Sequence, residues 1–192
     1  WQFRVASPVP QVGHIYGLGV AGYWGNTIEI EAVVHPLGNR EKGAIHFNDT
    51  AGSMARDSVT NASSVVRMIT GKNLSDYDVH VNVVGGGNID GPSAGAAITC
   101  AIISALTGKP LRQDIAVTGE ISLSGRIKPV GGIAEKAFGA HQGGMKAILI
   151  PKQNALDMGS EYMHMKVIPV DTIQDILEHM LARKKQKMKG SK

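Results

Sequence analysis

The sequence has one cysteine, few aromatic residues and no long apolar run. Cys100 is the single cysteine among 192 residues, so the chain cannot form an internal disulfide. Aromatic residues make up 5% of the chain, and no apolar stretch approaches the roughly 20 residues that cross a bilayer. These absences argue against a disulfide-stapled secreted domain and against a membrane-spanning protein. We expect a reducing, cytoplasmic location.

The first ten residues, "WQFRVASPVP", contain no methionine and none of the basic or apolar regions of a signal peptide. We therefore expect the chain to begin inside a longer protein. Its hydrophobic fraction of 43% suffices for one good core in a chain of this length but not for two large ones. The sequence therefore predicts a single domain over residues 1–182.

Charge is concentrated at the C-terminal end. The formal net charge is +4, and six of the basic residues fall within 183–192, so the rest of the chain carries about −2. No aromatic residue is interleaved with these lysines to offer a stacking platform for bases. We interpret 183–192 as a basic, solvated, disordered tail and expect no nucleic-acid partner.

Hydrophobic periodicity predicts an α+β fold, with a sheet and helices packed together rather than a doubly wound sheet. Residues 28, 30, 32 and 34 are apolar and alternate with glutamates 29 and 31, as in a half-buried strand. Strands are expected at 14–20, 26–34, 77–84, 147–151 and 166–170, helices at 54–70, 92–107, 131–144 and 172–185, and a hairpin over 115–130 turning at 124–125.

The stretch "IDGPSAG", residues 89–95, places a serine between two glycines at the start of an apolar segment. Pro92 suits the first position of a helix and Gly108 suits its C-terminal cap. Ser93 is thus predicted in the first turn of a helix that is apolar around most of its circumference. Serine is a preferred capping residue, so Ser93 either caps this helix or carries chemistry.

Three glycine-rich motifs can be tested against this segment. No lysine lies between Gly85 and Gly95, which excludes a P-loop, and the dinucleotide pattern fails because its third glycine would be Asp90. The pattern G-x-S-x-G does fit at Gly91, Ser93 and Gly95, as in the nucleophile elbow of α/β-hydrolases. That elbow follows a strand directly, whereas here a glycine-rich loop intervenes, and such a fold normally needs a longer chain.

A serine hydroxyl needs a base to remove its proton and donors to stabilise an oxyanion. The start of the predicted helix offers backbone N–H groups. Among the histidines, His14, His35 and His46 fall in the N-terminal strands or their connections, and structural roles are expected for them. Lys136 lies at the border of the apolar face of helix 131–144, where desolvation would favour the neutral amine that a base requires. The alternative is that Lys136 extends its amine to solvent.

The segments "DGPSAG" and "TGEISLSGRIKPVGGIAEKAFGAHQGGMKAILIP", with Ser93 and Lys136 separated by 43 residues, resemble the proteolytic domain of the Lon peptidase family. The resemblance covers residues 13–181 and is closest to the bacterial LonB branch and related LonC-type proteins. It implies a ribosomal-protein-S5-domain-2-like fold, cleavage of unfolded or damaged polypeptides, and a six-membered ring that encloses the active sites.

The resemblance also implies roles for individual residues. Ser93 matches the family nucleophile and Lys136 the general base of a Ser-Lys dyad. Thr118, in "TGE", matches the threonine that orients the lysine. Asp90 matches an acid that pairs with the lysine in an inactive state of some members, so we expect it to be regulatory.

The segment "GLGVAGYWGNTIEIEA", residues 17–32, resembles the strand and loop along which the family binds its extended substrate. This implies that Gly22, Tyr23, Trp24 and Gly25 contact the substrate. The sequence departs from the family in two places: Tyr23-Trp24 makes the loop tip bulkier, and a histidine pair appears as His80 and Asn82.

Most Lon-like proteins carry an ATPase module upstream, and we expect ATP and magnesium to bind such a module. No cofactor or metal site is expected in this domain. Two other functions remain as alternatives. One is a non-catalytic S5-like module for assembly and DNA contact, as in the DNA-repair protein RadA, although Ser93, Thr118 and Lys136 together argue against it. The other is an α/β-hydrolase esterase with a histidine base.

Overall fold

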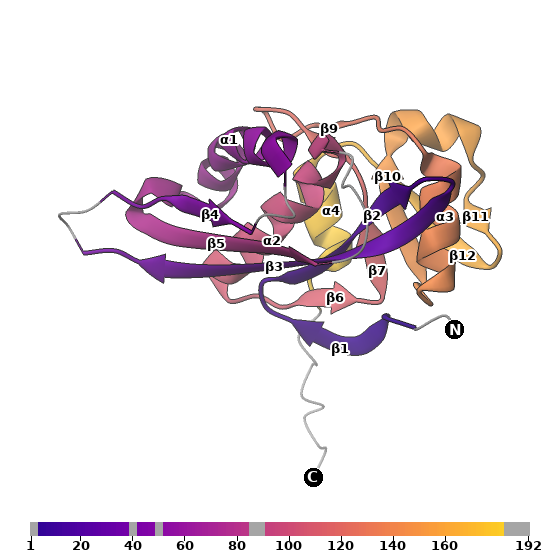
Figure 1. The fold of residues 1–192 in the computed structure, drawn as a ribbon, viewed down its shortest axis with the longest axis horizontal. Helices are drawn as coiled ribbons and strands as arrows, with labels where there is room; N and C mark the ends of the chain where they lie inside the picture. The colour runs from indigo at the N-terminus through magenta and orange to yellow at the C-terminus, as the bar shows by residue number, and fades with distance from the viewer. Residues whose placement is uncertain (1–3, 39–41, 49–51, 85–90, 183–192) are drawn as a thin grey trace, which may run out of the picture.

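The computed structural model describes residues 4–38, 42–48, 52–84 and 91–182, which form a mixed sheet with helices on both faces (Figure 1). The eight strands of the main sheet run in the order β11-β12-β10-β7-β2-β3-β5-β4. Their bounds are β2 His14–Ala21, β3 Trp24–Pro36, β4 Ile45–Phe47, β5 Tyr77–Val84, β7 Ile115–Val117, β10 Ala147–Pro151, β11 Glu161–Tyr162 and β12 Met165–Val170. Two further pairs, β1 (Ser7–Gln11) with β6 (Leu111–Gln113) and β8 (Glu120–Ile121) with β9 (Ile127–Lys128), are antiparallel.

Strands β2, β3 and β5 are antiparallel to one another, with the short edge strand β4 parallel to β5, and the alternation of apolar and polar residues in β3 matches the sequence expectation. β2 and β3 form a hairpin in register from His14 opposite Glu31 to Ala21 opposite Trp24, and β5 pairs with β3 on the other side. Ile28, Ile30 and Ala32 of β3 are buried. An antiparallel sheet with one face on the core has this pattern of burial.

The other half of the sheet is parallel apart from its edge strand β11, which is antiparallel to β12. β10 lies between β12 and β7, and β7 pairs in turn with β2, all in parallel. All residues of β7 and β10 are buried, as expected for short apolar runs covered on both faces. The predicted mixture of sheet and helices is therefore confirmed, with a parallel half that the periodicity left unassigned.

Helices cover the two faces unequally. Buried residues of α1 (Gly52–Thr70), α2 (Gly95–Thr107) and α4 (Ile173–Met180) join one apolar cluster with Ile115, Val117 and Leu149 of the sheet. Buried residues of α3 (Ile133–Gln142) join a second cluster with Ala116 and Ile148. Because successive strand residues point to opposite faces, α1, α2 and α4 lie on one face and α3 on the other.

Two helices differ from the sequence expectation at their ends. The segment Gly91–Ala94 is a 3₁₀ turn, η3, and the α-helix begins only at Gly95, although it ends as expected at a left-handed Gly108. Helix α4 ends at Met180 instead of continuing to 185. Its apolar residues Ile173, Ile176, Leu177 and Met180 are buried inside the domain.

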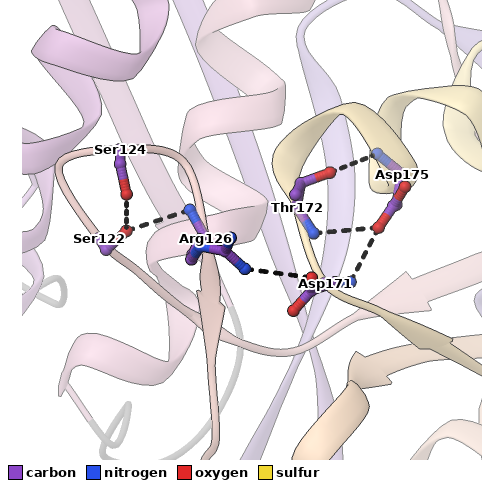
Figure 2. A network of polar contacts seen from close by, with 6 residues as sticks. All are labelled: Ser122, Ser124, Arg126, Asp171, Thr172 and Asp175. Atoms are coloured by element: carbon purple, nitrogen blue, oxygen red, sulfur yellow. Dashed lines mark hydrogen bonds and ion pairs between the residues drawn. The ribbon is translucent and has the colours of Figure 1, made fainter.

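The hairpin predicted over 115–130 is shorter in the structure, because residues 115–117 form β7 of the main sheet. The remaining hairpin, β8–β9, turns at residues 124–125 as predicted, and a polar network ties it to the start of α4 (Figure 2). Ser122 Oγ accepts from Arg126 N at 3.1 Å, and the Arg126 guanidinium reaches Asp171 Oδ2 at 3.2 Å. Asp175 then accepts from the backbone N–H groups of Asp171 and Thr172 at 2.9 and 3.1 Å. The helix predicted at 172–185 therefore begins with a complete capping box.

Among the described residues, no helix combines the length and apolar character needed to span a membrane. The basic tail, residues 183–192, lies outside the described part of the chain, so its predicted disorder and the domain boundary before it stay predictions.

Candidate active site at the carboxyl end of β7

Ser93 lies in η3, and two backbone hydrogen bonds attach this turn and the start of α2 to the residue after Thr118. Gly119 N donates to Ser93 O at 3.0 Å, and Ala96 N donates to Gly119 O at 3.0 Å. Gly119 has to be small here, because a Cβ would lie 2.5 Å from Ile127 Cγ2. The sequence between these two segments is long, yet the backbone holds Ser93 and Thr118 at one end of β7.

Ser93 does not cap helix α2. The N-cap residue is Ala94, and no side-chain cap is present. The Ser93 side chain is buried, and Oγ has no hydrogen-bond partner among the residues that the structure describes. The capping interpretation is therefore wrong, and a buried hydroxyl remains at the N-terminal end of α2, where the helix dipole favours negative charge.

Thr118 continues the β7 ladder by one residue, since its N–H donates to Leu149 O at 3.1 Å. The alternation along β7 directs Ala116 toward α3, and the same alternation assigns Thr118 to the α3 side. Its side chain is fully buried, and within the described residues Oγ1 has no hydrogen-bond partner. A hydroxyl thus faces the side of the sheet that α3 covers.

Lys136 lies in the first turns of α3 and is fully buried, with 0% of its surface exposed. No other lysine or arginine is buried among the side chains that the structure describes. Its neighbour Ala137 packs in one cluster with Ala116 of β7 and Leu18 of β2. The alternative in which Lys136 extends to solvent is therefore wrong, and the lysine is buried on a helix that packs on the same face of the sheet as Ala116 of β7.

Helix α3 comes unusually close to β3 because glycines meet at the contact. A Cβ on Gly139 would lie 2.3 Å from Gly25 C, and a Cβ on Gly25 would lie 1.6 Å from Glu135 O. Only two residues without side chains permit this approach of backbones. Gly25 was expected to contact the substrate, and its contact with Gly139 was not predicted, because the pairing of distant glycines has no signal in a single sequence.

The β2–β3 turn exposes the aromatic residues expected at its tip. Tyr23 is 94% exposed and Trp24 is 67% exposed, and the Trp24 ring lies 6.0 Å from that of Phe138 on α3. Gly22 adopts a positive φ of 63° in the turn. The turn therefore stands beside the helix that carries Lys136, whereas Asp90 lies outside the described residues.

Other candidate groups are engaged elsewhere. Asn82 donates to Glu31 Oε1 at 3.0 Å, and His80 stacks on His46. Both ring nitrogens of His14 face oxygen atoms, Nε2 at 2.6 Å from Glu29 Oε1 and Nδ1 against Gln113 Oε1. Burial raises the pKa of the Cys100 thiol, which removes it as a nucleophile at neutral pH.

A family model for the Lon protease (S16) C-terminal proteolytic domain matches residues 2–183. The chain belongs to the Lon protease family. It is a Lon-type serine peptidase domain, as the resemblance implied, and the α/β-hydrolase alternative is excluded by this membership.

Curated relatives agree with the family model. The chain is 37% identical to the archaeal Lon protease of Archaeoglobus fulgidus over 92% of its length, and 38% identical to Lon protease 2 of Bacillus subtilis over 90%. It is 37% identical to Lon protease 1 of Thermus thermophilus over 92%. Archaeal and bacterial Lon proteins are thus about equally similar to the chain, and the LonB or LonC branch stays a prediction.

The chain spans 29%, 33% and 22% of the length of these three Lon proteins, respectively. The similarity therefore concerns the proteolytic domain and not the activities of the whole Lon proteins.

Proposed function

We propose that this domain is an endopeptidase in which Ser93 is the nucleophile, Lys136 the general base and Thr118 the residue that orients the lysine amine. The observation that carries the proposal is the complete burial of Lys136 in α3, whose apolar residues share a cluster with Ala116 of β7. Burial disfavours the ammonium form of lysine and so favours the neutral amine that can accept a proton.

In this mechanism Ser93 Oγ forms a bond to the carbonyl carbon of the scissile peptide, and its proton passes to Lys136 Nζ. The tetrahedral oxyanion collapses, the C–N bond breaks, and the amine leaves with the proton from Nζ. Water then attacks the acyl carbon while Lys136 Nζ takes a proton from it, the bond between that carbon and Ser93 Oγ breaks, and Nζ returns the proton to Oγ as the carboxylic acid product leaves. Thr118, buried beside this region, positions the amine through its hydroxyl.

The substrate is proposed to be an unfolded or damaged polypeptide, bound in extended form beside β2–β3. Exposed Tyr23 and Trp24 support this location, because aromatic side chains contribute large apolar contact area to peptide binding. Gly22 supplies the positive φ that the β2–β3 turn needs, and Gly25 permits the close contact of β3 with α3. Asp90 is proposed as a regulatory acid on the strength of the family resemblance alone.

The domain is proposed to work in the cytoplasm, in a six-membered ring and attached to an ATPase module that binds ATP and magnesium. The greater length of its Lon relatives supports the attached module. The apolar residues of helix α4 pack in the domain core, so this helix does not offer an apolar face to a ring interface. The S5-domain-2-like fold and the bacterial LonB or LonC branch belong to this proposal as well. Sedimentation velocity over a range of concentrations tests the assembly.

The decisive experiment labels the nucleophile. The domain is incubated with a β-lactone that acylates activated serine, and intact mass is compared for wild type and Ser93→Ala. Wild type should gain one acyl group and degrade casein, and Ser93→Ala should do neither while melting at a similar temperature. If the Ser93→Ala variant gained the same acyl group as wild type, or cleaved casein at the wild-type rate, Ser93 would be excluded as the nucleophile. A non-catalytic module of the RadA type would show no adduct in either protein.

A further inference from the structure

A cluster of metal-ligating side chains lies on the solvent face of the other end of the sheet. His46, Asp78 and His80 each offer one ligand atom, a ring nitrogen or a carboxylate oxygen, and these three atoms lie within 4.8 Å of one another. His80 and Asp78 are two residues apart on β5 and share a face, while Val79 and Val81 are buried on the opposite one. His46 on β4 is directly opposite His80 in the register.

The spacing of these groups approaches that of a metal coordination sphere. His46 Nε2 lies 3.5 Å from Asp78 Oδ1. Bonds of about 2.0–2.1 Å to a tetrahedral ion hold ligand atoms roughly 3.3 Å apart. The His46 and His80 rings stack with centroids 4.6 Å apart and planes at 16°, so small side-chain rotations bring their nitrogens toward a common point.

The carboxylate is already oriented for this role. Ala44 N donates to Asp78 Oδ1 at 3.2 Å, and a hydrogen bond to a ligating carboxylate fixes its direction. An aspartate at this position supplies an anionic oxygen ligand at neutral pH, because the ordinary carboxyl pKa is about 3.9.

A third histidine lies beside the cluster. His35 on β3 is opposite Asp78 in the β3–β5 register, and its ring centroid lies 6.1 Å from that of His80. All four side chains therefore come from three adjacent strands of one sheet. Imidazole and carboxylate together suit zinc, cobalt, nickel or copper rather than magnesium or calcium.

We propose that His46, Asp78 and His80 bind a divalent transition-metal ion such as Zn²⁺, with His35 or water completing the coordination. The ion would join β4, an edge strand of three residues, to β5 through side chains as well as through the backbone ladder. This revises the expectation that the domain has no metal site. The site does not depend on the peptidase mechanism, because none of its residues takes part in it.

The test measures zinc binding directly on tag-free domain that has been treated with a chelator and dialysed. Isothermal titration with zinc chloride should give one equivalent, and substituting cobalt should give the visible absorption of a tetrahedral site. Asp78→Asn and His80→Gln should each weaken zinc binding by about tenfold or more, since loss even of an outer-shell partner costs roughly that much. Zinc should also raise the melting temperature of wild type and not of these variants.

His164→Asn is the matched control. His164 is a fully exposed histidine beside Glu161, at 3.6 Å, and it lies outside the cluster. Asparagine tolerates the positive φ of 68° at this position. The control should bind zinc as wild type does. Equal zinc affinity in wild type, Asp78→Asn and His80→Gln would overturn the proposal, as would the absence of any saturable binding to wild type.

Discussion

Gly139 of α3 and Gly25 of β3 lie in backbone contact, so closely that a Cβ on Gly139 would be 2.3 Å from Gly25 C and 2.5 Å from Asn26 N. Lys136 is three residues before Gly139 on the same helix, and Glu135 O faces Gly25 from the preceding turn. The seating of α3 on the sheet therefore sets the position of the proposed base.

Gly139→Ala tests this contact. In an unobstructed helix alanine is more favourable than glycine by about 1 kcal/mol, but here its methyl group meets backbone that cannot rotate away. Overpacking of this kind costs roughly 1–3 kcal/mol, so we expect a lower melting temperature and a loss of peptidase activity. Gly131→Ala is the control, because its Cβ would meet nothing within 4 Å. A Gly139→Ala variant more stable than wild type would show that α3 can shift freely on β3.

Thr118→Val separates the orienting hydroxyl from packing. Valine has nearly the same shape, and the hydroxyl that it removes is buried without a hydrogen-bond partner in the described part of the chain. The variant should therefore melt no lower than wild type, while kcat falls without reaching zero. Thr118→Ser keeps the hydroxyl and should retain more activity than Thr118→Val. If both variants have wild-type kcat, Thr118 does not orient the base.

Tyr23→Ser tests the proposed substrate surface. The Tyr23 side chain is 94% exposed, so its loss should leave the melting temperature unchanged. KM for an unfolded protein substrate should rise while kcat changes little, because contact area is lost equally in the bound and transition states. Leu156→Ser removes a comparably exposed apolar side chain, 89% exposed, on η4 (Lys152–Asp157), and should leave KM unchanged. Equal KM values for the two variants would remove Tyr23 from the substrate surface.

Local periodicity was sufficient to predict most elements, because half-buried strands and amphipathic helices leave their pattern in the sequence. It gave β3 and β5 with the correct faces, and it placed α3 between its glycines. Periodicity did not predict the 3₁₀ turn at Ser93, where a tertiary hydrogen bond joins Gly119 N to Ser93 O. It also did not show that α4 turns its apolar face inward, because the pattern marks a buried face without naming what covers it.

Sequence patterns alone predicted less of the candidate site than of the fold. On the helical wheel Lys136 stood at a border, and only tertiary packing shows that it is fully buried. The pairing of Ser93 with Lys136 came from the resemblance to the Lon family, because no local sequence pattern predicts it. The His46, Asp78 and His80 cluster had one local signal, an aspartate and a histidine two apart on a strand. Its third member depends on the parallel pairing of β4 with β5.

Asp175→Asn tests a stability contribution that depends on pH. Hydrogen bonds from Asp171 N first, and also from Thr172 N, hold the pKa of the Asp175 carboxyl below its usual value. A carboxyl whose folded pKa is depressed stabilises the fold above its unfolded pKa of about 3.9 and loses that contribution as pH falls through the folded value. The variant should be less stable than wild type by about 1 kcal/mol at pH 7, as for the loss of a helix cap.

The difference between Asp175→Asn and wild type should shrink below about pH 4, where the wild-type carboxyl also becomes neutral. Urea unfolding monitored by circular dichroism at pH 7, 5 and 3 measures it. Glu178→Gln is the control, an exposed carboxylate later in the same helix. A constant difference at all three pH values would assign the effect to amide packing instead of to the charged carboxylate.

Lys136 provides the sharpest test of the proposed chemistry, because two substitutions keep its length while changing its ability to accept a proton. Lys136→Met keeps the aliphatic chain and removes the amine, and Lys136→Arg keeps the positive charge in a group that stays protonated over the accessible pH range. Both variants should lose peptide cleavage, and circular dichroism should show that Lys136→Met retains the fold. Lys152→Met, at an exposed lysine on η4, is the control and should remain active.

The wild-type rate should rise with pH as the buried amine loses its proton. The midpoint of this rise should lie well below the pKa of about 10.4 of an ordinary lysine. A histidine base would instead give a rate increase with its midpoint near pH 6.5, the reference pKa of histidine. Activity would then survive in Lys136→Arg. Initial rates of peptide cleavage from mild acid to pH 10 distinguish these outcomes. Because arginine cannot act as the base under these conditions, near-normal turnover by Lys136→Arg would exclude the lysine whatever the rest of the pH profile shows.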